Sequence, residues 1–162
     1  EDPQSPEHTA DAFRLYGLNL QHKHVPEIQC HSGLSHRPIF VPSVARFRQG
    51  MIVQVPLQLW SLPTRPKPAE VHAALADHYR GQRFVSVAPL EEAAGLGRLE
   101  PEFLNGTNDM RIFVFADPSA EQAVVCAVLD NLGKGASGAA VQNLNIMLGY
   151  DAASGLEGKL AA

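Results

Sequence analysis

The chain is poor in several features, and each shortage excludes a class of protein. It has only two cysteines in 162 residues, Cys30 and Cys126, far apart and in no CxxC spacing. They cannot form a disulfide framework or a cysteine-ligated zinc site, and they fit reduced thiols in the cytoplasm. Because no run of about eighteen apolar residues and no secretory leader pattern occurs, we expect no membrane-spanning segment.

Basic charge is also scarce. The formal net charge is -4, the isoelectric point is near 5.9, and no basic run is present. Nucleic acid and anionic membranes are therefore not expected as main partners. The hydrophobic content of 45% is enough for one well-buried core, so a single domain is the default.

Both ends of the sequence are polar and lack periodicity. The chain starts without methionine and carries Pro3 and Pro6, so residues 1–15 are predicted as a linker or loop of something longer. Residues 16–149 form the predicted domain, and residues 150–162 form a tail.

Apolar periodicity and turn residues predict about six strands and three helices. The predicted strands are 16–21, 39–47, 51–62, 84–88, 111–116 and 122–128, and the predicted helices are 26–32, 69–81 and 136–149. A short link at 48–50 suggests a hairpin between the second and third strands. Because the helices are grouped rather than alternating with strands, the fold class is α+β with a mixed, largely antiparallel sheet.

The stretch 129–149 passes from a strand through a glycine-rich turn into a helix. One helical face carries an apolar stripe predicted to face a core: Ala136, Ala140, Leu144 and Leu148. Another face carries Gly135, Gly138, Gln142 and Asn145, where small residues permit a close approach to the backbone. The glycine spacing matches neither a P-loop nor a complete dinucleotide-binding unit, so spacing alone favours an ordinary strand-to-helix corner.

His22, His24 and Glu27 form the other constellation. On a strand, residues two apart face the same way, so both imidazoles could converge, with Glu27 close to His24. Geometry alone supports two interpretations about equally: the histidines act in acid/base chemistry, or they are partly exposed side chains without a catalytic role. A metal site is less favoured because no fourth ligand is evident.

Two segments together resemble the N-acetyl-gamma-glutamyl-phosphate reductase family. The stretch from Leu129 to Asn145, reading LDNLGKGASGAAVQNLN, is similar to the family's signature near its C-terminus. HKHVPEI at 22–28 resembles the family's HxHxPEI segment, and Gly106-Thr107-Asn108 follows in the family's order. The resemblance covers nearly the whole chain from Tyr16.

The resemblance implies an NADPH-dependent reduction of an acyl phosphate to a semialdehyde in arginine biosynthesis. In the family a cysteine thiolate attacks the acyl phosphate, hydride reduces the thioester, and a histidine acts as acid and base. By motif match that histidine is His24, with Glu27 as its partner. His22 and Asn108 are implied to bind substrate, while Asn131 and Gly135 are implied to face the cofactor.

The resemblance also implies an architecture. The fold should be that of the catalytic domain of the glyceraldehyde-phosphate and aspartate-semialdehyde dehydrogenase superfamily, a mixed sheet with helices on one face. Residues 130–149 should face an NADP-binding domain, and the protein should be a dimer or higher homo-oligomer. The family's Gly-Cys-Tyr-Pro motif and its amino-terminal Rossmann half do not occur here, although Gly133, Gly135 and Gly138 have the GxGxxG spacing. Neither Cys30 nor Cys126 matches the nucleophile, so the chain alone is expected to be inactive.

Two other functions stay open on the residues. One is a non-catalytic, dimerising module that binds an acylated amino acid. The other is a small metal-binding protein that uses His22, His24 and Glu27.

Overall fold

The computed structural model describes residues 12–158. The chain divides into two compact units, Glu1–Arg48 and Gln49–Ala162, and each is described by itself. The first part of the predicted linker, residues 1–11, and the end of the predicted tail, residues 159–162, lie outside the described residues.

The first unit contains a short strand pair and one helix. Strand β1 (Phe13–Leu15) pairs antiparallel with β2 (Ser43–Ala45), so part of the predicted linker is ordered as a strand. Helix α1 spans His24–Ser32, and Gly33 ends it in the left-handed conformation at φ 69°. A glycine at this position satisfies the last turn without steric penalty, so the predicted end of the helix is confirmed.

Two strand predictions in this unit are wrong. Residues 16–21 form a turn, in which the Leu20 amide donates to the Gly17 carbonyl at 2.9 Å and both residues have positive φ. The predicted strand 39–47 shrinks to β2, because Pro38 and Pro42 remove backbone donors just before it. The predicted hairpin at 48–50 is also wrong, since β2 pairs with β1 and not with the following strand.

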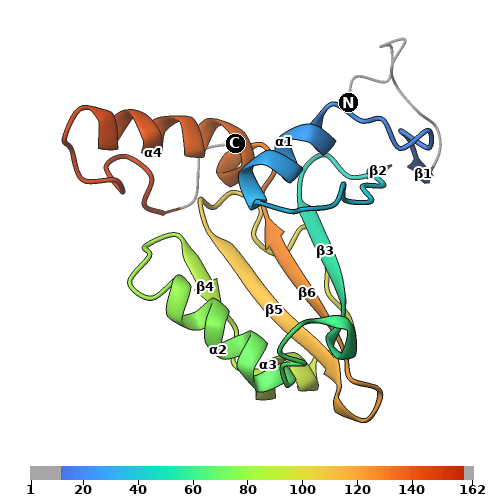
Figure 1. Cartoon of the computed structure of the whole chain (residues 1–162). Helices are drawn as coiled ribbons and strands as arrows, with labels where there is room; N and C mark the ends of the chain where they lie inside the picture. The colour runs from blue at the N-terminus through green and yellow to red at the C-terminus, as the bar shows by residue number, and fades with distance from the viewer. Residues whose placement is uncertain (1–11, 159–162) are drawn as a thin grey trace. The chain divides into compact units, whose positions relative to one another are not determined.

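The second unit is built on a four-stranded sheet of order β3-β6-β5-β4. Its strands are β3 (Met51–Gln58), β4 (Val85–Val87), β5 (Met110–Asp117) and β6 (Gln122–Leu129). The pairs β3–β6 and β6–β5 are antiparallel, while β4 and β5 are parallel. Figure 1 shows the three long strands side by side, with the short β4 beyond β5. The mixed, largely antiparallel sheet is thus confirmed, and with it the α+β class.

Helices α2 (Pro68–His78) and α3 (Leu90–Gly95) flank this sheet. Pro68 opens α2 as predicted, and Glu70 accepts a hydrogen bond from the Lys67 amide at 2.7 Å. This reciprocal contact satisfies an amide that has no partner within the helix. A 3-10 turn, η1 (Leu59–Ser61), follows β3 and ends the long strand predicted over 51–62.

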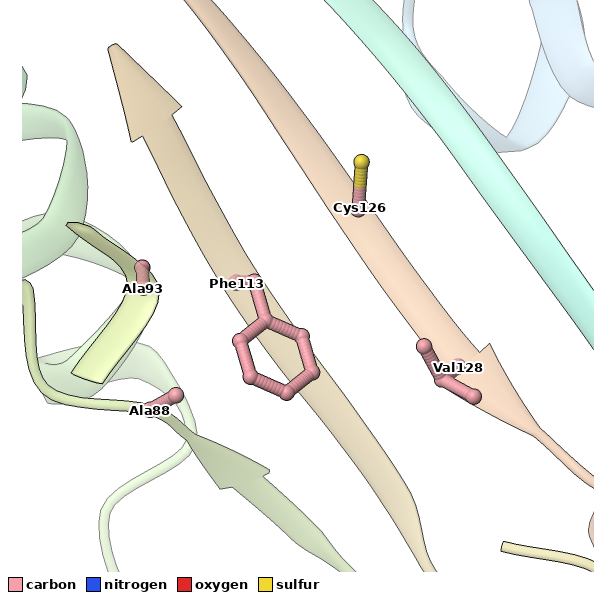
Figure 2. Close-up of a cluster of buried hydrophobic side chains, with 5 residues drawn as sticks. All are labelled: Ala88, Ala93, Phe113, Cys126 and Val128. Atoms are coloured by element: carbon pink, nitrogen blue, oxygen red, sulfur yellow. The ribbon is translucent and has the colours of Figure 1, made fainter. Parts of the chain in front are cut away.

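The core has one cluster on each face of the sheet. Because side chains alternate along β5, Phe113 and Val114 point to opposite faces. Figure 2 shows the cluster on the Phe113 face, which consists of Ala88, Ala93, Phe113, Cys126 and Val128. On the Val114 face, Val71 and Leu75 of α2 pack against Leu59, Val114 and Ala123. Leu90 of α3 also packs on the Val114 face, whereas Ala93 of the same helix packs on the Phe113 face.

The buried and exposed faces of the C-terminal helix are the reverse of those predicted. A π-helical turn, η3 (Gly133–Ser137), leads into α4 (Gly138–Met147), which extends beyond the end of β6 in Figure 1. The stripe predicted to face a core is exposed: Ala136, Ala140, Leu144 and Leu148. Gly138 and Asn145, on the small-residue face, are buried instead. Leu144 and Leu148 of the stripe are 52% and 60% exposed, so the described residues cover the stripe only in part.

None of the helices found among residues 12–158 combines the length and the apolar character needed to cross a bilayer.

Candidate functional site

The start of α1 brings the predicted acid/base residues together. The ring centroids of His22 and His24 lie 4.8 Å apart, and His24 Nε2 lies 4.0 Å from Glu27 Oε2. The convergence is confirmed, but the predicted strand geometry is wrong, because His24 is the first residue of a helix. Glu27 reaches His24 from one turn further along α1, the usual spacing of neighbouring side chains on a helix.

Aromatic rings enclose His22 within this unit. The Tyr16 ring lies 5.7 Å from the His22 ring and the Phe40 ring lies 5.2 Å from it, both edge to face. Phe40 also reaches the His24 ring at 6.2 Å. Val25 is buried and anchors α1, whereas His24 and Glu27 keep side-chain exposures of 50% and 64%. So exposed an ion pair adds little stability, and its value is in orienting the imidazole.

In the second unit, a buried carboxylate joins segments far apart in sequence. Asp130 is 1% exposed and follows β6 directly. Its Oδ2 accepts from Gln49 Nε2 and the Gly106 amide, both at 2.8 Å. Its Oδ1 accepts from the amides of Leu132 at 2.9 Å and Gly133 at 3.0 Å.

Burial alone would raise the pKa of the Asp130 carboxyl. The hydrogen bonds from Gly133, Gly106, Leu132 and Gln49 outweigh burial, and the pKa lies below its usual value. Asp130 is therefore a fixed anion that holds this corner together. Sequence reasoning missed it, although a charged residue directly after a buried strand is the available signal.

Asn131 sits beside this carboxylate with a defined amide orientation. Its Oδ1 accepts from the Gly50 amide at 2.7 Å, and no described residue accepts from its Nδ2. Gly50 has φ 110°, and a Cβ there would lie 2.5 Å from the Pro101 carbonyl oxygen, so only glycine fits. Asn105 also binds the segment before Gly50, because its Nδ2 donates to the Gln49 carbonyl at 3.1 Å.

Asn108 is buried against the start of α4. It is 2% exposed, and neither polar atom of its side chain has a partner among the described residues. Its Oδ1 lies so close to Gly138 that an added Cβ at that glycine would overlap it. The predicted close approach to the small-residue face is thus confirmed, and the approaching group is Asn108.

Gly135 and Lys134 belong to the same corner. The Gly135 amide donates to the Asp130 carbonyl at 2.8 Å, and a Cβ on Gly135 would lie 3.8 Å from that of Asn131. Lys134 donates from Nζ to Gln142 Oε1 at 3.1 Å. Burial lowers the pKa of the Lys134 ammonium, and the nearby Asp109 carboxylate offsets part of this effect. The backbone amides of Leu132, Gly133 and Gly135 all donate to Asp130, so this strand-to-helix turn has few free backbone donors for an anion.

The six predicted site residues thus form two groups, one in each unit. His22, His24 and Glu27 converge in the first unit. Asn131 and Gly135 are neighbours in the second unit, where Asn108 lies against Gly138. Besides Asp130, sequence reasoning missed the rings that enclose His22. Among residues 12–158, no cluster of three or more histidine, cysteine or acidic side chains is arranged to hold a metal ion.

The architecture is that of an α+β domain with a mixed sheet. The chain belongs to the semialdehyde dehydrogenase dimerisation-domain family, whose sequence model matches residues 1–131. This match supports the fold class inferred from the sequence.

Several curated relatives match this chain over most of its length. A protein from Brucella anthropi, named N-acetyl-gamma-glutamyl-phosphate reductase, is 58% identical over 149 residues, 92% of this chain and 48% of the relative. Proteins of the same name from Brucella ovis and Brucella canis are each 57% identical over the same shares. The chain spans about half the length of these relatives, and the resemblance inferred from the motifs is confirmed.

Proposed function

We propose that this chain is the substrate-binding and dimerisation half of an NADPH-dependent N-acetyl-gamma-glutamyl-phosphate reductase. The observation that carries the proposal is the convergence of His22, His24 and Glu27 at the start of α1. The names of the Brucella relatives support the reaction class, and the family name supports a homo-oligomer.

In this proposal His24 is the acid/base residue. A neutral imidazole can take a proton from an attacking thiol and later return it to the oxygen of the forming aldehyde. The Glu27 carboxylate, 4.0 Å from Nε2, stabilises the charged imidazolium and orients the ring. Neither cysteine lies in the family's Gly-Cys-Tyr-Pro motif. Cys126 is also buried in the sheet, and burial raises the pKa of its thiol, whereas Cys30 is exposed near the end of α1.

The second unit would contribute to the nicotinamide side. Asn131 fits such a role, because its Oδ1 is fixed by the Gly50 amide and its Nδ2 remains a donor for a carboxamide oxygen. Gly135 has no side chain and is exposed, so a bound group can approach its backbone there. NADPH, when bound, supplies hydride, and most of its contacts would come from the half of the protein that this chain does not span.

The exposed apolar face of η3 and α4 is proposed as the surface that packs on that other half. Leu144 is 52% exposed and Met147 is 82% exposed, and Val141 and Ile146 are exposed too. A helix with so much exposed apolar surface normally has a partner. The other half of a reductase is the favoured occupant, because the match covers only 48% of the Brucella anthropi relative.

A graft tests the proposed function. This chain replaces the matching half of the Brucella anthropi reductase, and His24→Ala is compared with His31→Ala, an exposed histidine in the last turn of the same helix. Loss of general acid/base catalysis lowers kcat by about 10²–10⁴-fold, while the His31 variant keeps the parent rate. Near-parental turnover by the His24 variant removes this residue from the mechanism.

A further inference from the structure

The two histidines of the first unit make different contacts. His22 Nδ1 accepts a hydrogen bond from the backbone amide of His24 at 3.3 Å. His24 Nε2 instead faces the Glu27 carboxylate. The rings are neighbours, but within residues 12–158 only His24 has an acidic partner.

The amide bound by His22 belongs to a helix start. His24 opens α1, and the first amides of a helix have no acceptor within it. Lys23 occupies the N-cap position and its side chain makes no capping hydrogen bond. His22, one residue before the N-cap, instead accepts from the amide of the first helical residue, whereas a capping serine, threonine or aspartate accepts from the second or third.

This contact selects one tautomer of the neutral His22 imidazole. Accepting a hydrogen bond requires a lone pair on Nδ1, so the ring proton of the neutral imidazole lies on Nε2. An imidazole with its proton on Nδ1 could not accept this hydrogen bond. The Tyr16 and Phe40 rings, edge to face with His22, hold the imidazole plane in the orientation that the contact needs.

We propose that His22 is a positioning residue that caps α1 as the neutral Nε2–H tautomer and thereby sets the orientation of His24. Acid/base chemistry belongs to His24 alone. The helix cap stands independently of the proposed function, whereas its effect on turnover rests on that function.

Asparagine and glutamine separate the two nitrogens of the histidine. The amide oxygen of Asn occupies roughly the Nδ1 position, and the longer Gln places its amide near Nε2. His22→Asn therefore keeps the capping acceptor, and His22→Gln is the matched variant that loses it.

The tautomer is measured on this chain by ¹⁵N NMR of the histidine rings at neutral pH. A His22 proton on Nε2 is the expected result, and a proton on Nδ1 overturns the proposal. The second readout is hydrogen exchange at the His24 amide. Losing a helix cap is expected to speed this exchange about fivefold in His22→Gln and not in His22→Asn. Equal exchange in both variants contradicts the capping role.

The grafted reductase then separates positioning from structure. His22→Gln is expected to lower kcat more than KM changes, and His22→Asn to recover most of the lost kcat. Equal kcat values for the two variants reject the link from the cap to His24. If the graft shows no reductase activity at all, the proposed function fails, while the NMR result still decides the helix cap.

Discussion

Replacing Gly138 by alanine tests how closely α4 packs against Asn108 within the second unit. An added Cβ would overlap Asn108 Oδ1 and lie 2.9 Å from its Cγ and 3.0 Å from the Gly133 carbonyl oxygen. Asn108 is buried, so its side chain cannot swing into solvent. Overpacking costs about 1–3 kcal/mol, and alanine recovers about 1 kcal/mol of helix propensity. Because backbone is also in the way, we expect the overpacking cost at its upper end of about 3 kcal/mol, and hence a net loss of about 2 kcal/mol in the free energy of unfolding.

Urea unfolding followed by circular dichroism measures this loss, with Gly135→Ala as the matched control. A Cβ on Gly135 would meet Leu129 Cδ1 at an ordinary 3.4 Å, so that variant keeps or slightly increases stability. Adding Asn108→Ala to Gly138→Ala removes the clash with the Asn108 side chain and should restore part of the lost stability. The recovery is only partial because the added Cβ still lies 3.0 Å from the Gly133 carbonyl oxygen. If Gly138→Ala is as stable as Gly135→Ala, the packing argument is refuted.

Three further predictions follow from the second unit and the cysteines. In Asp130→Asn, the new side-chain NH2 group would replace one carboxylate oxygen and face N–H groups that also need an acceptor. This variant should lower the free energy of unfolding by about 2–3 kcal/mol in urea titrations. Because the pKa of folded Asp130 is lowered, its stabilisation is complete above the unfolded carboxyl's pKa of about 4 and disappears as pH falls through the lower folded value. The gap between the parent and Asp130→Asn should therefore narrow below about pH 4, and a constant gap contradicts this assignment. A thiol reagent should modify the exposed Cys30 in the folded chain and Cys126 only after unfolding; equal rates at both cysteines argue against a buried Cys126. Replacing Leu144 and Met147 by serine should change the chain's stability by less than about 0.5 kcal/mol, because both are exposed, whereas a large loss means that α4 packs within the chain.

Local chemistry made part of the fold predictable. The sheet's central strands β5 and β6 were visible as apolar, β-branched runs, and Pro68 marked the start of α2. Gly33 marked the end of α1 for an equally local reason, its access to the left-handed conformation. These signals do not depend on distant parts of the chain.

Pairing and burial were less predictable because they depend on distant segments. The periodicity of α4 identified an apolar stripe, but periodicity does not say whether the stripe's partner belongs to the same unit. The stripe containing Leu144 is exposed, and the face containing Gly138 is packed by Asn108. Likewise, the short 48–50 link resembled a hairpin, but β3 pairs with β6 from the far end of the chain.

The candidate site shows the same division. The spacing of His22, His24 and Glu27 predicted their convergence, although the turn into α1 and not a strand produces it. Asp130 was missed because its partners, such as Gln49 and the Gly106 amide, are far from it in sequence. The position of Asp130 directly after a buried strand was the available signal, but it does not identify partners far away in the sequence.

The most direct test of the central claim is NADPH oxidation in the presence of N-acetylglutamyl phosphate, measured for this chain alone and for the Brucella anthropi graft. We expect no turnover by the chain alone and substrate-dependent turnover by the graft. Turnover by the chain alone, or a folded graft that oxidises no NADPH while the Brucella parent does, would contradict this expectation.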